Sequence, residues 1–361
     1  MKTVKPINAI LFTAIFSLII GSLFQFNVYA TFTVLFIMAL FMKPAENALF
    51  MAVQKEIWEN DIIVNLFKNN DFAKRAYNAD QFVIGGKIVH IPVAGAPDAS
   101  QKNVTVFPIN AVKRADDEVL YPLDTFYQIP KFVEKVEQYE LSYDKRQSIM
   151  GEQQSQLIQD CMEGLLYRWS LQGKNMDTPI NYVLTTGAAT ATDVLTGAAG
   201  SRKTFDKTVF GAIKKAFDNA NISPTGRVAL LTANHYQQFI DSLSDAAQTN
   251  FYRFADMQKG VIGQFLGFDV LMRSSVQRWR RTAGVWASVD IQAAGFAPGS
   301  NDSAASLFYY DQYVERARGD VNVFDSANRP EYYGDVFSMN MRLGGRVRKA
   351  VGVTAVVEDI V

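Results

Sequence analysis

The sequence predicts a mixed α+β fold in which one long helix is surrounded by β structure. Three stretches indicate it. Residues 142–173 contain no proline and repeat apolar side chains at spacings of three and four, as an amphipathic helix does. Residues 205–275 follow with a helix-strand-helix-strand order, and residues 337–357 alternate apolar and polar side chains like a half-buried β-sheet. The predicted helix would be on the order of 45 Å long, which suits an extended scaffold with other parts along it.

The composition excludes several classes of protein. The chain has 361 residues, with 36 Lys and Arg against 36 Asp and Glu, so there is no basic excess that would indicate nucleic acid as the main partner. A single cysteine, Cys161, excludes an internal disulfide framework. Two histidines, His90 and His235, argue against a histidine-rich metal site.

The first fifty residues differ from the rest of the chain. No charged side chain occurs between Pro6 and Met42, and Lys2 and Lys5 precede this run. The pattern fits a membrane segment, and its first half also has the layout of a secretory signal peptide. An upstream start codon would explain it equally well, since Met51 opens a stretch of ordinary soluble character. Membrane contact is therefore expected only through residues 1–50, whose status stays open.

The segment between this leader and the long helix reads as one helix followed by extended chain. Residues 46–67 fit a helix, and Gly85-Gly86 between two β-rich runs predicts a hairpin. In residues 93–141, Pro108, Pro122 and Pro130 bar a helix and suit edge strands. Their apolar side chains have few partners nearby in sequence, so we expect this arm to pack against something else.

The long helix and the segments after it have recognisable ends and faces. Ser142 is the expected N-cap of the long helix, and Gly173 is its expected end. Asn234 is expected to cap the helix that follows the buried strand VALLT. At the C-terminus, the alternation from Phe337 to Leu343 is followed by Gly344-Gly345, which predicts a hairpin turn at these glycines.

The sequence contains only incomplete matches to motifs of catalysis or cofactor binding. GAAGSRKT, residues 197–204, resembles a phosphate loop but has Arg202 where that loop needs glycine, so a solvated turn is expected. Arg278-Trp279-Arg280-Arg281 mixes charge and aromatic character, and we interpret it as a charged loop paired with acidic neighbours. His90 and His235 lack a partner at a diagnostic spacing, and Cys161 lies on the apolar face of the long helix. We therefore expect no catalytic, cofactor-binding or metal-binding residues.

The order of these parts resembles the major capsid proteins of tailed bacteriophages, which share the Hong Kong 97 fold with encapsulins. The resemblance covers about residues 51–361 and rests on an arm helix, the hairpin GGKIVHIPV, an extended loop, a long spine helix, a helix-strand-helix segment and long return strands. It implies the following parts: a hydrophobic leader of open status (1–50), an N-terminal arm (51–79), a β hairpin with an extended loop (80–140), the spine helix of the peripheral domain (141–178), the apical domain (179–306) and the return strands of the peripheral domain (307–361). The leader departs from the family pattern.

The resemblance also implies a function without enzyme activity. The chain would self-assemble through hexamers and pentamers into an icosahedral shell around phage double-stranded DNA, bound by non-specific contact. Scaffolding and portal proteins would be further partners, and the shell would form in the bacterial host cytoplasm and end in the virion. Two alternatives remain open from sequence: an encapsulin-like compartment shell and a membrane-anchored surface protein.

The extended arm is where we expect subunits to meet. Its apolar side chains need burial that the arm itself cannot provide, and its charged residues can pair across an interface. The expected interface residues are Phe107, Ile109, Val112, Lys113, Arg114, Leu120 and Tyr121.

Overall fold

A computed structural model describes residues 70–93, 102–103, 113–114, 117–135, 145–173, 175–191, 195–256 and 259–361. All belong to one compact unit, Glu59–Val361. The leader and the helix expected over 46–67 lie outside these residues, as do Phe107, Ile109 and Val112 of the expected interface.

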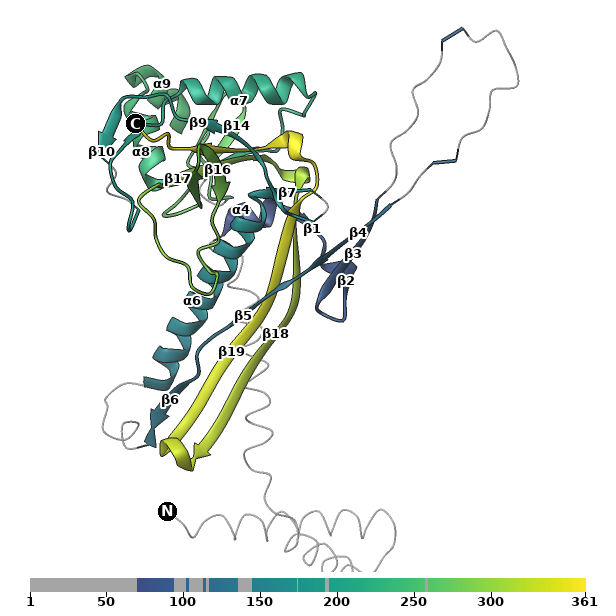
Figure 1. Ribbon diagram of the computed structural model, residues 1–361, viewed down its shortest axis with the longest axis vertical. Helices are drawn as coiled ribbons and strands as arrows, with labels where there is room; N and C mark the ends of the chain where they lie inside the picture. The colour runs from purple at the N-terminus through teal and green to yellow at the C-terminus, as the bar shows by residue number, and fades with distance from the viewer. Residues whose placement is uncertain are drawn as a thin grey trace, which may run out of the picture. The chain divides into compact units, whose positions relative to one another are not determined.

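The long helix α6, Lys145–Arg168, is the spine of this unit (Figure 1). With 24 residues it is about 36 Å long. The predicted apolar stripe is confirmed: Met150, Leu157, Ile158, Cys161, Met162, Leu165, Leu166 and the following Trp169 are all buried. The helix ends before the predicted Gly173, because Trp169 turns into the core and donates its indole N–H to Glu315 O at 2.9 Å. The next residues, Leu171–Gln172, form the short strand β7.

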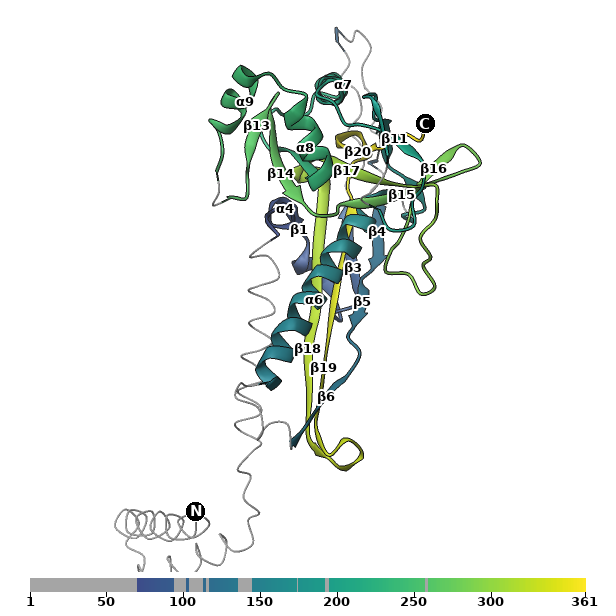
Figure 2. The same ribbon diagram turned by 90° about the vertical axis from the view of Figure 1, so that its left-hand side faces the viewer.

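A sheet built on one long hairpin lies against α6 (Figure 2). Its strands β18, Val314–Arg329, and β19, Gly334–Val347, are antiparallel and are joined through the short helix η4, Pro330–Tyr332. β1, Tyr77–Asn78, runs parallel to β18, while β5, Asp124–Tyr127, and β6, Lys131–Glu134, pair one after the other with β19. The predicted alternation is confirmed, because Phe337, Met339, Met341 and Leu343 are buried.

The predicted turn at Gly344-Gly345 is wrong, because β19 continues through both glycines. Glycine is needed there for close packing rather than for a turn. A Cβ on Gly345 would lie 2.4 Å from Glu315 O and 2.5 Å from the Leu165 side chain. Gly164 is the matching contact on the helix, where a Cβ would lie 2.5 Å from the ring of Phe126. The two glycines allow α6 to approach the sheet closely.

We expect Gly345→Ala to destabilise the subunit by about 1–3 kcal/mol, the usual cost of an extra methyl group in a tightly packed site. Gly151 offers a matched control, since it lies on α6 at a position where an added Cβ would meet open space. Gly151→Ala should stabilise the helix slightly. Chemical denaturation of both variants checks this, and equal stability of the two would show that the contact is not tight.

A second, eight-stranded sheet lies in the same unit. The strand order is β13-β14-β12-β17-β15-β16, and β20 pairs with both β17 and β9. The strands are β9 Asn181–Leu184, β12 Arg227–Thr232, β13 Gly263–Phe265, β14 Phe268–Arg273, β15 Gln277–Thr282, β16 Val285–Ser288, β17 Asp302–Tyr310 and β20 Val353–Val357. The boundary expected between the apical domain (179–306) and the return strands (307–361) falls inside β17. β20, from the expected return strands, lies in one sheet with strands of the expected apical domain.

Three helices pack on this sheet through a core rich in phenylalanine. They are α7, Thr208–Asn219, α8, Ala233–Asp241, and α9, Asp245–Tyr252. The ring of Phe210 lies at the centre, 4.8 Å from that of Phe239 and 4.9 Å from that of Phe308. The expected cap of α8 is wrong: Thr232, not Asn234, accepts the hydrogen bond from His235 N, at 3.2 Å.

The predicted hairpin at Gly85-Gly86 is confirmed and forms one end of a three-stranded sheet. β2, Val83–Ile84, β3, Ile88–Val93, and β4, Asp117–Pro122, pair in that order. Both glycines have positive φ, 59° and 63°, a conformation that suits glycine. The remaining elements are α4 Asp71–Arg75, η1 Asp80–Phe82, β8 Thr178–Pro179, β10 Ala189–Ala191, β11 Ser201–Lys203, η3 Asp311–Tyr313 and η5 Ala350–Gly352.

Within the described ranges, no helix has the length and apolar character that crossing a membrane requires. The same residues contain no cluster of three or more histidine, cysteine or acidic side chains arranged to hold a metal ion.

Candidate assembly interface

The ribbon of β2, β3 and β4 has one buried and one exposed face. Val89 and Tyr121 are paired across β3 and β4, and with Ile91 and Leu123 they pack on Ala317 of β18. The opposite face carries Ile84, Ile88 and Leu120, which are 59%, 39% and 50% exposed. This exposed face also holds an ion pair, with His90 Nδ1 2.7 Å from Glu118 Oε1.

The expectation that Tyr121 packs on a neighbouring subunit is corrected by its position. The side chain is only 1% exposed and belongs to the core of its own subunit. Burial and the nearby carboxylate of Glu315 raise the pKa of its hydroxyl, so it stays protonated. Successive side chains of a strand point to opposite faces, so Tyr121 is buried where its neighbour Leu120 is exposed. The sequence prediction assigned both residues to the interface.

The other expected interface residues that the structure describes are exposed, so they stay candidates for the interface. Leu120 lies on the exposed face of the ribbon, and Lys113 and Arg114 are exposed further along the arm. Sequence reasoning missed Ile84 and Ile88, although their pairing through Gly85-Gly86 places them on the same face as Leu120. We name Ile84, Ile88 and Leu120 the ribbon face.

A second exposed apolar patch lies at the end of the long hairpin. The rings of Phe132 and Tyr332 are 5.4 Å apart, and both side chains are about half exposed. Three further apolar side chains are exposed: Tyr127 of β5 at 72%, Ile129 at 79% and Tyr333, beside Tyr332, at 83%. No sequence pattern singled out these residues, because turn aromatics and an isolated isoleucine carry no periodic signal.

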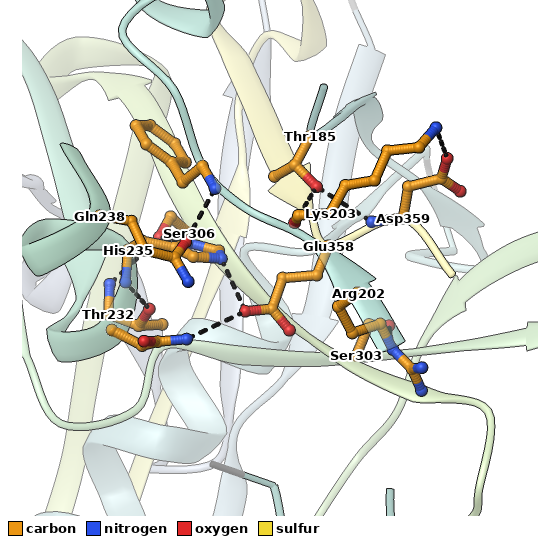
Figure 3. A network of polar contacts seen from close by, with 12 residues as sticks. Thr185, Arg202, Lys203, Thr232, His235, Gln238, Ser303, Ser306, Glu358 and Asp359 are labelled. Atoms are coloured by element: carbon orange, nitrogen blue, oxygen red, sulfur yellow. Dashed lines mark hydrogen bonds and ion pairs between the residues drawn. The ribbon is translucent and has the colours of Figure 1, made fainter. Parts of the chain in front are cut away.

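A buried polar network connects the end of β20 to α8 (Figure 3). His235 Nδ1 lies 2.6 Å from Ser306 Oγ, and His235 Nε2 lies 3.1 Å from Glu358 Oε1. This serine-histidine-carboxylate order is the arrangement used in nucleophilic catalysis. Here Ser306 and His235 are 0% exposed, and Ser306 Oγ also accepts a hydrogen bond from Thr232 N at 3.1 Å. A substrate could reach the hydroxyl only if the core opened, so the network is structural, as predicted for His235.

Two sequence motifs that suggested ligand contacts are also part of the core. Arg202 of GAAGSRKT is 2% exposed, so the expected solvated turn is wrong at this residue. Its guanidinium donates to Ser303 Oγ at 2.8 Å and to the carbonyl oxygens of Ser300 and Asp302, both at 2.9 Å. Burial lowers its pKa.

The arginine-tryptophan motif lies in strand β15 rather than in a loop. The expected acidic neighbour is Asp302, which is buried and contacts Arg280 Nε at 2.5 Å and Arg280 Nη2 at 3.0 Å. Arg278 Nη1 is further from the same carboxylate, at 3.7 Å. The motif therefore stabilises the sheet, and neither of these arginines is a free nucleic-acid contact.

This buried ion pair predicts acid sensitivity. Burial alone would raise the pKa of Asp302, but hydrogen bonds from Arg280 and Gly299 N and the charges of Arg280 and Arg278 outweigh it, so the pKa is lowered. The carboxylate therefore adds stability above the ordinary aspartate pKa of about 4, and this part is lost as the pH falls below that value. We expect Asp302→Asn to be less stable at pH 7 and to lose less on acidification. Denaturation of both proteins at pH 7 and pH 3 checks this. The prediction is contradicted if both lose the same free energy of unfolding between the two pH values.

Comparison with solved structures identifies the fold. The capsid protein of the cyanophage P-SCSP1u aligns with a TM-score of 0.53 and 15% identity, over 80% of this chain and 87% of that one. The capsid protein of Ralstonia phage GP4 aligns with a TM-score of 0.53 and 12% identity over 80% and 87%. For the cyanophage Pam1 capsid the values are 0.51, 15%, 80% and 92%.

At the level of sequence, no family model and no curated protein matches the chain. The likeness is therefore one of three-dimensional structure. The chain has the fold of these phage capsid proteins over about four fifths of its length, in agreement with the Hong Kong 97-type fold that the order of its parts predicted.

Proposed function

We propose that the chain is a major capsid protein that assembles with copies of itself into an icosahedral shell enclosing phage double-stranded DNA. The observation that carries this proposal is the capsid fold, shared with three phage capsid proteins over about 80% of the chain. The fold is built on the spine helix and the sheets around it, and the serine-histidine-carboxylate contact within it is buried.

The ribbon face supplies a physical reason for association. Ile84, Ile88 and Leu120 are about half exposed in the subunit, and burying the exposed part would contribute roughly 1 kcal/mol each. The same contact repeats at every subunit of a closed shell, so weak contacts add up. The balance of 36 basic and 36 acidic residues keeps repulsion between crowded copies low.

Further parts of the proposal follow from the shell function. Hexamers and pentamers would form the shell in the host cytoplasm, with scaffolding and portal proteins as partners during assembly. The DNA would be held by non-specific contact, and the finished protein would be located in the virion. Residues 94–116 would form the extended loop that reaches a neighbouring subunit.

The test is sedimentation velocity of the full chain over a wide range of concentration, followed by nuclease treatment of any large particles from infected cells. We expect fast-sedimenting closed particles with nuclease-resistant DNA. A monodisperse subunit at high concentration would contradict the proposal. Particles that enclose a protein cargo without DNA would favour an encapsulin-like compartment, and recovery of the chain only in membranes would favour a surface protein.

A further inference from the structure

A cavity lies beside the spine helix, under the loop that joins β16 to β17. It has a volume of about 310 Å³. Leu195, Val276, Val289, Ile291, Phe296 and Pro298 give it mainly apolar walls. The loop is tied to α6 by Gln292 Nε2, which donates to Glu163 Oε2 at 3.1 Å, and Figure 1 shows it beside that helix. A space of this size and lining is typical of a small-molecule site.

Two polar groups that line this cavity have unused hydrogen-bonding capacity. Ser288 Oγ is buried and has no hydrogen-bond partner among the described residues. The side chain of Arg278 is 10% exposed, and within the same part of the chain its guanidinium donates one hydrogen bond, to Thr196 O at 2.9 Å. Buried polar groups are normally satisfied, so an unsatisfied hydroxyl in the lining of a cavity that Arg278 also lines indicates a missing partner.

The charge of Arg278 is also incompletely balanced. Its carboxylate neighbour Asp302 is 3.7 Å away and is engaged at 2.5 Å and 3.0 Å by Arg280. Burial and the nearby charge of Arg280 lower the pKa of Arg278. Its aliphatic and guanidinium surface lies over the ring of Phe296, with 5.4 Å from the guanidinium carbon to the ring centroid. An anion bound beside Arg278 would gain both the charge and the spare donors of its guanidinium.

We propose that this cavity binds a small amphipathic carboxylate, with its apolar body among the side chains of the loop and its carboxylate at Arg278 and Ser288. Glu163 also lines the cavity, accepts hydrogen bonds from Ser275 and Gln292, and disfavours an anion beside its own carboxylate. The positive charge of Arg278 and the negative charge of Glu163 therefore orient the carboxylate toward Arg278. A bound molecule would hold the loop against α6 and stabilise the subunit in proportion to its concentration.

This inference is independent of shell assembly, and its test uses the full chain with octanoate as the probe. Titration calorimetry should show saturable binding of one octanoate per subunit, and the melting temperature should rise with octanoate concentration. Octylamine, which has the same apolar length and the opposite charge, should bind at least tenfold more weakly. Equal binding of octanoate and octylamine, or heat that does not saturate, would overturn the proposal.

Substitutions of residues in the cavity test whether octanoate binds there. Ser288→Ala removes the unpaired hydroxyl without a fold penalty and should weaken octanoate binding about threefold to tenfold. Leu195→Trp should fill the cavity and abolish binding. Val285→Trp is the matched control, because Val285 is 65% exposed on the neighbouring part of β16 and should bind octanoate normally. If Ser288→Ala binds like the unaltered chain, or if both tryptophan variants bind alike, the proposed site is wrong.

Discussion

Replacing Leu165 by aspartate is expected to leave no folded subunit. Leu165 is 1% exposed and lies against the sheet at Gly345, where an added Cβ would be 2.5 Å from the Leu165 side chain. The substitution places a charge without a partner in this core and removes a large apolar side chain, which together cost several kcal/mol. Since whole domains are stable by only about 5–15 kcal/mol, the protein should be insoluble or unfolded. Soluble yield and thermal melting by circular dichroism measure the effect.

The matched control introduces the same carboxylate at an exposed position of the same helix. Ser155 is exposed, and its hydroxyl donates to Gly151 O at 3.0 Å. Ser155→Asp should therefore fold and melt like the unaltered chain. A Leu165→Asp protein with normal melting would mean that the buried face of α6 is assigned incorrectly.

Shortening the extended arm is expected to separate folding from assembly. Val93 and Asp117 are paired across β3 and β4, so residues 94–116 can be replaced by Asn-Gly while the ribbon keeps its register. The core contacts of Tyr121 with β18 remain in this variant. The subunit should therefore keep its circular dichroism spectrum and lose assembly in sedimentation velocity. Full-size particles would show that residues 94–116 are not the contact, and an unfolded subunit would place them in its own core.

A point substitution on the ribbon face makes the same test more local. Leu120→Ser should weaken assembly, because Leu120 is 50% exposed and is expected to be buried by a neighbouring subunit. Val361→Ser, at an apolar residue that is 69% exposed at the C-terminal end, is the control and should assemble normally. Equal assembly of the two variants would remove Leu120 from the interface.

Local patterns in the sequence predicted the fold where one element carries its own signal. The stripe of α6 from Met150 to Trp169 and the alternation from Phe337 to Leu343 follow directly from helical and strand periodicity. Gly85-Gly86 likewise encodes its hairpin through positive φ. The order of these parts was enough to identify the capsid fold by resemblance.

The remaining features depend on partners that are distant in sequence. A side chain at Gly345 would collide with Leu165 of α6 and with the following Trp169. These residues are too distant in sequence for the residues around Gly345 to indicate the contact. His235 is paired with Glu358, 123 residues later, so its role could not be read from neighbouring residues. The same reason applies to Tyr121, which is buried in a cluster with residues distant in sequence, among them Leu171 and Ala317.

The most direct test of the shell hypothesis is cryo-electron microscopy of the particles that the full chain forms. We expect closed shells built from pentamers and hexamers, with Ile84, Ile88 and Leu120 of one subunit buried against its neighbour. The hypothesis is contradicted if the chain stays monomeric at every concentration, or if its assemblies leave the ribbon face in solvent.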